Sequence, residues 1–209
     1  MHLFFGYDII SYMDGPGHKP AGCSDSGIFR CAGGARGPFK AQKWGGVASM
    51  DKWDVRFMEL TRQVGSWSSC FQPGRHVGAI IVRDKRVMTT GYNGAPAGIV
   101  SCVEKGRCLR REMEIASGTR QELCYAVHAE QNAIIQAAKY GISVNGATLY
   151  CTHQPCVICA KMIINAGIRR VVYEQGYPDA FSLQLFREAG TVLEKFVPPD
   201  EDGPAEEGK

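Results

Sequence analysis

The sequence predicts an α/β fold, a three-layer α/β/α sandwich with a central mixed five-stranded sheet. Two observations point to this class. Short apolar runs alternate with segments of helical periodicity between residues 50 and 197. The first two runs are joined by a tight turn at Asp84 and Lys85, as in a hairpin, whereas helix-length segments separate the later runs.

Each element follows from its local pattern. A first helix is expected over 51–66, where the apolar side chains that recur on one face are Trp53, Phe57, Leu60 and Val64. Strands are expected at 77–82, 86–92, 147–151, 169–173 and 191–196. The other helices are expected at 125–140, 155–166 and 180–189, after a long irregular segment at 93–124. In the helix at 125–140 the apolar face is expected to hold Val127, Ile134, Ile135 and Ala138.

The two ends of the chain differ from its middle. Residues 1–49 are crowded with Gly and Pro and lack an apolar period, which predicts a disordered or mis-annotated leader. Residues 198–209 are acidic and Pro-rich, which predicts a disordered tail. The expected folded domain is therefore 50–197.

Composition excludes several classes of protein. The formal net charge of +3 is too small to indicate nucleic-acid binding. The sequence contains no run of about eighteen apolar residues, so it predicts no helix that spans a membrane. Nine cysteines, several of them closely spaced in a chain of 209 residues, favour bound metal in a reducing cytoplasm over a secreted disulfide scaffold.

The strongest chemical signal combines a His-Ala-Glu motif at His128 with a Pro-Cys-x-x-Cys motif at Pro155. Pro155 is expected at the first helical position, with Cys156 and Cys159 on one face of the first turn, where the positive helix terminus favours thiolates. His128 then supplies a third zinc ligand and leaves the fourth position to water. Glu130 lies beside this site as a proton carrier.

Two other interpretations of these motifs are open. One is a closed structural zinc site, and the other is a pair of buried cysteines beside a histidine at a helix start. The alternation of strands and helices around both motifs favours a catalytic site, because it fits the signature of zinc deaminases.

Three segments together resemble the deoxycytidylate (dCMP) deaminases of the cytidine/deoxycytidylate deaminase superfamily, which includes competence-operon relatives. They are the Gly-Tyr-Asn-Gly-Ala-Pro-Ala-Gly loop at 91–98, the segment 124–134 and the segment 155–159. The resemblance runs from about Met50 to Phe196 and implies a cytidine deaminase-like fold. It implies a hydrolase that acts on a cyclic amidine C–N bond and converts dCMP to dUMP and ammonia, supplying dUMP for dTTP synthesis.

The resemblance also implies roles for single residues. His128, Cys156 and Cys159 would bind the catalytic zinc, Glu130 would carry protons to N3 and the departing amine, and Asn93 would bind the sugar. From the local sequence alone, Asn93 is equally well explained as part of a turn. Further residues expected at the substrate lie beside the zinc motifs: Ala129, Thr152, His153, Gln154 and Pro155.

A second, structural zinc is implied by cysteines around the hairpin and the irregular segment, namely Cys70, Cys102, Cys108 and Cys124. Four half-buried thiols are an equal alternative. The sequence departs from the family's pattern at two places that affect the ligand set. Ser101 stands where many relatives have histidine, and the stretch of chain from Cys70 to the strand at Val77 is longer than usual. Of the other cysteines, Cys151 is expected in the core, and Cys23 and Cys31 fall in the leader.

The 5′-phosphate needs a cation, and the sequence singles out none. Candidates are Arg107, Arg110, Arg111 and Arg120 in the irregular segment and Arg83, Lys85 and Arg86 near the hairpin turn. The resemblance further implies dCTP and dTTP as effectors and a homo-oligomer. The competing functions are deamination of another nucleotide or of a tRNA base, and a competence-type accessory protein; Glu130 argues against the last.

Overall fold

The structure is a computed structural model that describes residues 50–116, 118–176 and 179–198. The expected leader, with Cys23 and Cys31, lies outside these residues, and so does the expected tail except for its first residue. The domain boundaries at both ends therefore stay predictions.

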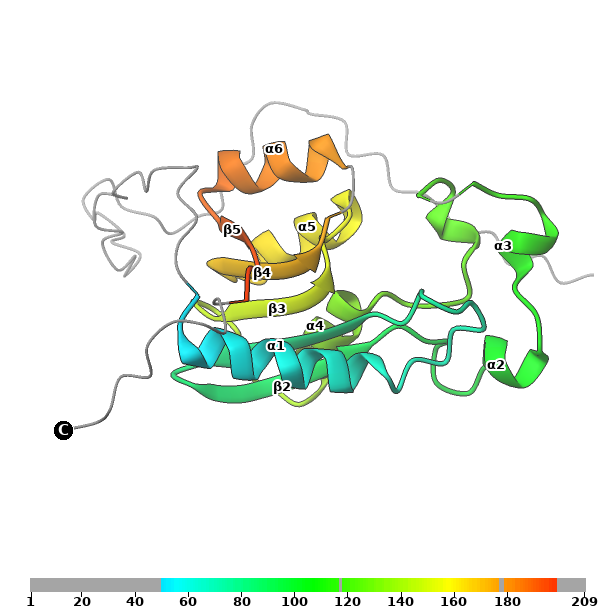
Figure 1. Cartoon of the computed structure of the whole chain (residues 1–209), viewed down its shortest axis with the longest axis horizontal. Helices are drawn as coiled ribbons and strands as arrows, with labels where there is room; N and C mark the ends of the chain where they lie inside the picture. The colour runs from blue at the N-terminus through cyan, green and yellow to red at the C-terminus, as the bar shows by residue number, and fades with distance from the viewer. Residues whose placement is uncertain (1–49, 117, 177–178, 199–209) are drawn as a thin grey trace, which may run out of the picture. The chain divides into compact units, whose positions relative to one another are not determined.

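A five-stranded mixed sheet forms the centre, as predicted, with strand order β2-β1-β3-β4-β5 (Figure 1). The strands are β1 (Gly78–Arg83), β2 (Arg86–Tyr92), β3 (Thr148–His153), β4 (Arg170–Gln175) and β5 (Val192–Lys195). Strand β1 is antiparallel to both β2 and β3, whereas β3, β4 and β5 run parallel. The hairpin reverses the chain between β1 and β2, and the helical connections then keep β2, β3, β4 and β5 in one direction, so β1 alone among these strands runs the opposite way.

Helices cover both faces of this sheet (Figure 1). Helix α1 (Lys52–Gly65) packs on one face, where Phe57, Met58 and Val64 meet Ile80 and Tyr150. On the opposite face, helices α4 (Ala129–Lys139), α5 (Val157–Asn165) and α6 (Ala180–Ala189) cover the alternate residues of the same strands. Because successive side chains of a strand point to opposite faces, each central strand contributes to both cores. The three-layer sandwich predicted from the sequence is confirmed.

Helix α1 (Lys52–Gly65) begins at a capping box. The carboxylate of Asp51 accepts hydrogen bonds from the first turn, and the carboxylate of Asp54 accepts one from the backbone N–H of Asp51 at 3.1 Å. The predicted face is correct except at Leu60, which is 38% exposed; Met58 and Thr61 are buried instead. Asp54 belongs to the buried side of the helix because its carboxylate has partners across the sheet.

Those partners form a polar network beneath α1. The hydroxyl of Tyr150 donates to Asp54 Oδ1 at 2.7 Å, and Arg170 Nη1 donates to the same oxygen at 2.6 Å. Arg170 also donates through Nε to Glu194 at 2.6 Å. Four side chains thus join α1 to β3, β4 and β5, and the buried carboxylate keeps its hydrogen-bond partners.

Helix α4 (Ala129–Lys139) lies unusually close to β2 at Gly91. A Cβ atom at Gly91 would overlap the carbonyl oxygen of Ala129 and the backbone nitrogen of Ala133. The buried face of α4 is accordingly made of alanines, whereas Ile135, predicted on the apolar face, is 49% exposed. The prediction for Ile135 was wrong because close helix–strand contact selects small side chains.

Both helices that carry the zinc motifs start later than predicted. Val127 pairs with Gly94 in an antiparallel bridge, so the chain stays extended up to His128, the N-cap of α4. Helix α5 (Val157–Asn165) has Cys156 as its N-cap, so Pro155 precedes the helix and is not its first residue. The predicted helical position of Pro155 was wrong.

The segment between β2 and α4 is mostly irregular, as predicted, and extends beyond one end of the sheet (Figure 1). It contains two one-turn helices, α2 (Cys102–Lys105) and α3 (Leu109–Glu112), and a short 3₁₀ helix, η1 (Gln121–Leu123). Among the described residues no helix is long and apolar enough to cross a membrane.

Candidate metal centre and cavity

Three side chains from the two zinc motifs meet at the start of α4 and α5. The Nδ1 atom of His128 lies 3.6 Å from Sγ of Cys156 and 3.4 Å from Sγ of Cys159. All three potential ligand atoms lie within 4.8 Å of one another. His128 and Cys156 are both N-cap residues with extended backbone, and Cys159 lies in the first turn of α5. Packing of two helix starts thus creates the group.

This group fits a tetrahedral zinc ion. Zinc binds imidazole nitrogen at about 2.0 Å and thiolate sulfur at about 2.3 Å, which places neighbouring ligand atoms about 3.6 Å apart. The pKa of Cys156 is lowered to about 4, because the Cys159 thiol donates to its sulfur and His128 lies beside it. One sulfur is therefore ready to bind as thiolate, and its hydrogen bond raises the pKa of His128.

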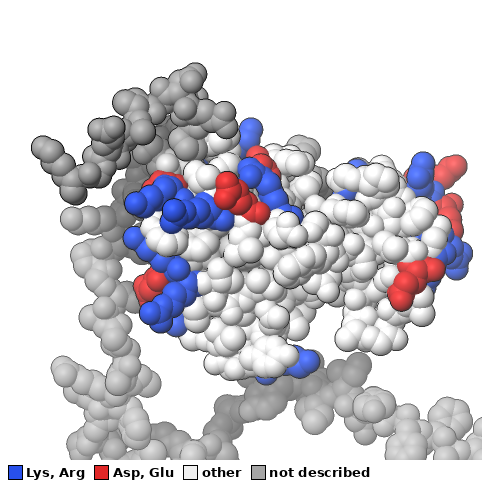
Figure 2. Space-filling view, turned by 60° about the horizontal axis from the view of Figure 1, so that its bottom comes forward, with Lys and Arg blue, Asp and Glu red and all other residues white. Residues whose placement is uncertain are grey.

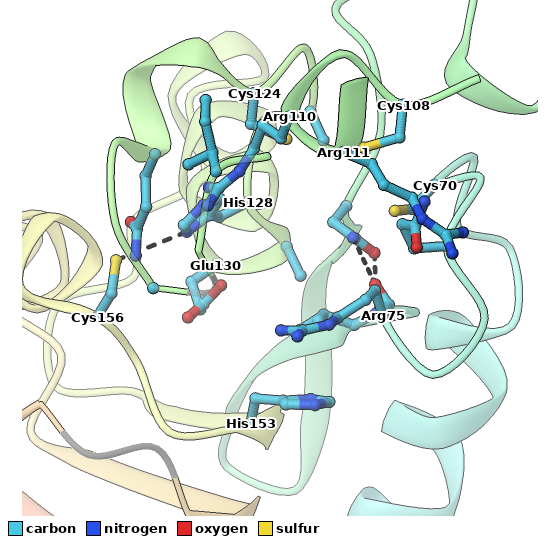
Figure 3. Close-up of a pocket in the computed structure, with 18 of the residues that line it drawn as sticks. Cys70, Arg75, Cys108, Arg110, Arg111, Cys124, His128, Glu130, His153 and Cys156 are labelled. Carbon is cyan, nitrogen blue, oxygen red and sulfur yellow. Dashed lines mark hydrogen bonds between the residues drawn. The ribbon is translucent and has the colours of Figure 1, made fainter. Parts of the chain in front are cut away.

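Glu130 is the second residue of α4, and it is only 4% exposed. Burial raises the pKa of its carboxyl group. Glu130 lines the same cavity as His128 and Cys156, so it faces the space beside the metal-binding group (Figure 3). A buried carboxyl group with a raised pKa is suited to exchanging protons with a bound molecule.

The cavity has a volume of about 460 Å³, which is large enough for a small molecule. Its walls come from the start of α4 with the end of β3 and the start of α5, from the segment between β2 and α4, and from the loop that precedes β1. Figure 3 shows Glu130, Arg75 and His153 around the same open space. The segment between β2 and α4 therefore borders the candidate site.

The residues predicted at the substrate divide into two groups. Asn93, Ala129, His153 and Gln154 line the cavity. Thr152 and Pro155 are buried and are not among its lining residues.

His153 is the ionisable member of that predicted set. Burial and the nearby charge of Arg75 lower its pKa. Its Nδ1 lies 3.0 Å from the hydroxyl of Thr152, which also accepts a hydrogen bond from the backbone of Gly78. Thr152 therefore orients His153 from behind the cavity wall.

The side-chain amide of Asn93 already has two partners in the protein. Its Oδ1 accepts from the backbone N–H of Val77 at 2.8 Å, and its Nδ2 donates to the carbonyl of Arg75 at 2.8 Å. Asn93 thus holds the loop before β1 while lining the cavity.

The predicted cations have different surroundings. Arg110 and Arg111 line the cavity, whereas Arg107 and Arg120 pair with the carboxylates of Glu112 and Glu122.

Arg75 also lines the cavity, and it was not among the candidates from the sequence. A Pro-Gly turn directly before Arg75 was the only local signal.

Three cysteines of the predicted second zinc site, Cys70, Cys108 and Cys124, line the cavity, and Cys102 is buried in α2. Within the described part of the chain, these four do not form a close group like that of His128, Cys156 and Cys159. The second zinc therefore stays a prediction. Cys151 is fully buried in the core, as expected.

Comparison with known proteins identifies the family. A family model described as cytidine and deoxycytidylate deaminase zinc-binding region matches residues 51–175. The deoxycytidylate deaminase of Schizosaccharomyces pombe is 38% identical over 149 residues, which cover 71% of this chain and 45% of the yeast protein. ComE operon protein 2 of Bacillus subtilis is 40% identical over 144 residues, or 68% of this chain and 70% of that protein.

A solved structure gives the same result. The dCMP deaminase of cyanophage S-TIM5, in complex with dCMP and dUMP, superimposes with a TM-score of 0.57 at 29% identity. The match covers 71% of this chain and 100% of the phage protein. This chain thus aligns with a complete phage enzyme but with less than half of the yeast one. On this evidence the chain belongs to the cytidine and deoxycytidylate deaminase family, whose shared feature is a zinc-binding region.

Proposed function

We propose that this protein catalyses the hydrolytic deamination of dCMP to dUMP and ammonia. The observation that carries the proposal is the position of Glu130, buried beside the group of His128, Cys156 and Cys159 at one cavity. Deoxycytidylate deaminase relatives from yeast and phage support the choice of nucleotide. Supply of dUMP for dTTP synthesis is the metabolic role that this reaction implies.

In the proposed mechanism, His128, Cys156 and Cys159 hold a catalytic zinc ion. Bound there, zinc would supply the Lewis acidity that makes water a nucleophile near neutral pH. The cysteine pair suits this role because one thiol is readily ionised. Both sulfurs must stay unoxidised to bind metal, so the proposal includes a reducing, cytoplasmic compartment.

Glu130 carries the protons in this mechanism. Its carboxylate takes a proton from the water that attacks C4 and delivers it to N3 of the cytosine ring. A further transfer protonates the amino group, the C4–N bond breaks, and ammonia leaves while C4 gains its oxygen. Burial favours the reaction because it raises the pKa of the carboxyl group toward neutral pH, where the group can both accept and release a proton.

The cavity walls orient the base in this proposal. The start of α4 at Ala129 and the end of β3 at His153 and Gln154 border the space in front of Glu130. Gln154 is 7% exposed, and its Nε2 atom donates to Oγ of Ser182 at 3.5 Å, so its amide has a defined position. Asn93 and His153 line the same cavity, so both border the substrate in this proposal.

Two other functions are less well supported. A deaminase of tRNA bases needs a continuous basic surface, but on the face in Figure 2 basic and acidic side chains occur together at both ends. An accessory protein is suggested by the likeness to ComE operon protein 2. Such a protein does not need a carboxyl group buried beside the metal ligands, where it loses solvation.

The decisive test compares Glu130→Gln with Glu59→Gln, a matched change on the exposed side of α1. Both variants should bind zinc like the unchanged protein, measured by elemental analysis. Glu130→Gln should lose at least about a hundredfold in kcat on dCMP, the contribution expected of a proton carrier, whereas Glu59→Gln should keep full activity. Full activity of zinc-loaded Glu130→Gln would refute the mechanism.

A substrate panel tests the choice of nucleotide. We expect ammonia release from dCMP to exceed that from CMP, dCTP, deoxycytidine and deoxyguanosine. Addition of dCTP or dTTP to the same assays tests the effectors that the resemblance implies, and sedimentation tests the homo-oligomer. Equal rates on dCMP and deoxycytidine would contradict recognition of the phosphate.

A further inference from the structure

Arg75 is an exposed cation at a cavity whose metal-binding side is buried. Its side chain extends across the cavity above His153 and toward Glu130 (Figure 3). The charge of Arg75 acts on His153, which places the two side chains at the same part of the wall. A ligand whose base reaches Glu130 therefore meets Arg75 with another of its groups.

The guanidinium group of Arg75 is available to a ligand. None of the ion pairs found among the described residues involves Arg75. Arg110, by contrast, donates from Nη2 to the carbonyl of Ala116 at 2.8 Å, so part of its donor capacity is used inside its own loop. Arg111 also lines the cavity and occurs in none of the ion pairs found among the described residues, so the test below includes it.

The backbone of Arg75 is held on both sides. Pro73 and Gly74 form a turn, with Gly74 at φ +72° and the N–H of Arg75 donating to the carbonyl of Gln72 at 3.2 Å. The amide of Asn93 bonds the carbonyl of Arg75 and the N–H of Val77, each at 2.8 Å. This longer connection from Cys70 to β1 thus directs Arg75 over the cavity.

We propose that Arg75, positioned by Asn93, binds the 5′-phosphate of the substrate and makes the protein select nucleotides over nucleosides. The inference rests on the proposed deaminase function and names its phosphate-binding residue. A guanidinium group is suited to this role because it donates two parallel hydrogen bonds to phosphate oxygens. His153, whose pKa is lowered, is a neutral neighbour that does not compete with Arg75 for the phosphate charge.

The test uses Arg75→Gln and Arg75→Lys, with Arg187→Gln on the exposed side of α6 as the matched control. For dCMP, Arg75→Gln should raise KM at least about tenfold, the scale of a lost hydrogen bond to a charged group, with a smaller change in kcat. Arg75→Lys should recover part of that loss. Activity on deoxycytidine should be the same in all variants, because the nucleoside has no phosphate.

A binding measurement keeps the test independent of turnover. Calorimetry with dUMP and deoxyuridine on the full chain should show weaker dUMP binding in Arg75→Gln and unchanged deoxyuridine binding. If the unchanged protein deaminates dCMP and Arg75→Gln shows the same KM for dCMP as the unchanged protein, the inference is wrong and the proposed function stands. If Arg111→Gln shows the loss instead, Arg75 is likewise refuted. Absence of deaminase activity in the zinc-loaded unchanged protein refutes the proposed function itself.

The positioning role of Asn93 has its own test, a double-mutant cycle with Asn93→Ala and Arg75→Gln. If Asn93 acts through Arg75, its replacement should raise KM for dCMP more than for deoxycytidine, and should add little once Arg75 is absent. Direct contact of Asn93 with the sugar predicts equal losses on both substrates and additive effects. That second outcome would contradict the positioning role.

Discussion

At the scale of single residues, the site depends on where two helices begin. His128 and Cys156 are extended N-cap residues, so their side chains turn away from the helix axes and toward each other. Cys159 follows within the first turn of α5, and Glu130 within the first turn of α4. The spacing within each motif thus places potential ligands at a helix start, and the contact between α4 and α5 brings these ligands close to one another.

Replacing a predicted ligand should remove the metal without unfolding the sheet. We expect Cys159→Ser to lose bound zinc, measured by elemental analysis, because a serine hydroxyl is a poor zinc ligand at neutral pH. Cys151→Ser is the matched control, since Cys151 is equally buried but lies outside the group. Zinc retained in Cys159→Ser and lost in Cys151→Ser would show that the ligand set is wrong.

At the scale of elements, helix α1 is fastened to the sheet by charge as well as by apolar contact. Burial by itself raises the pKa of Asp54, but hydrogen bonds from Arg170 and Tyr150 outweigh it and hold that pKa below its usual value. The ionised carboxylate therefore stabilises the fold, and its partners lie on β3 and β4.

The low pKa of Asp54 predicts how stability depends on pH. Its contribution is complete above the unfolded pKa of about 3.9 and disappears as the pH falls through the lower folded value. Asp54→Asn should therefore lower the free energy of unfolding by about 2 kcal/mol at pH 7. Urea unfolding of both proteins should show a smaller difference near pH 3. A difference that grows on acidification would contradict the assignment.

Helix α4 depends on a glycine of strand β2. Gly91→Ala introduces a methyl group where the backbone of α4 lies, so the helix must move outward with His128 and Glu130. We expect a loss of about 1–3 kcal/mol in stability by urea unfolding, together with weaker zinc binding. In Gly176→Ala the new methyl group meets open space, so this control should change neither quantity. Normal zinc affinity in Gly91→Ala would mean that α4 tolerates the shift.

At the scale of the whole molecule, the start of helix α1 bears on the predicted domain boundary at residue 50. The capping box of Asp51 and Asp54 satisfies the start of α1 without any earlier residue. A chain that begins at Met50 should therefore keep the melting temperature and the dCMP activity of the full chain. Loss of either in calorimetry or ammonia assays would show that residues 1–49 contribute to the domain.

The metal content of the whole chain tests the predicted second site. One zinc per chain is expected if Cys70, Cys102, Cys108 and Cys124 are free thiols, and two if they bind metal. Zinc analysis of Cys108→Ser separates the cases, because a structural site would lose one ion while the catalytic one remains. An unchanged count in that variant would exclude Cys108 as a ligand.

Much of this architecture was predictable because its signals are local. The alternation of apolar strands with periodic helices predicts a sheet with helices on both faces. The nearly continuous burial of β1 and β3 agrees with central strands that are covered on both sides. Errors occur where tertiary contact overrides periodicity. The exposed Ile135 and the late starts of α4 and α5 reflect close packing at Gly91, the bridge at Val127 and the N-cap position of Cys156.

The sequence alone singled out the candidate metal ligands and the candidate proton carrier, because their spacing within two motifs encodes position at a helix start. Only the tertiary structure decided which distant groups share the cavity. Arg75 lies 55 positions before Glu130 in the chain (130 − 75), and its local sequence resembles any turn. It reaches the site because a Pro-Gly turn and the amide of Asn93 fold its loop over the end of the sheet, a contact that no local pattern records.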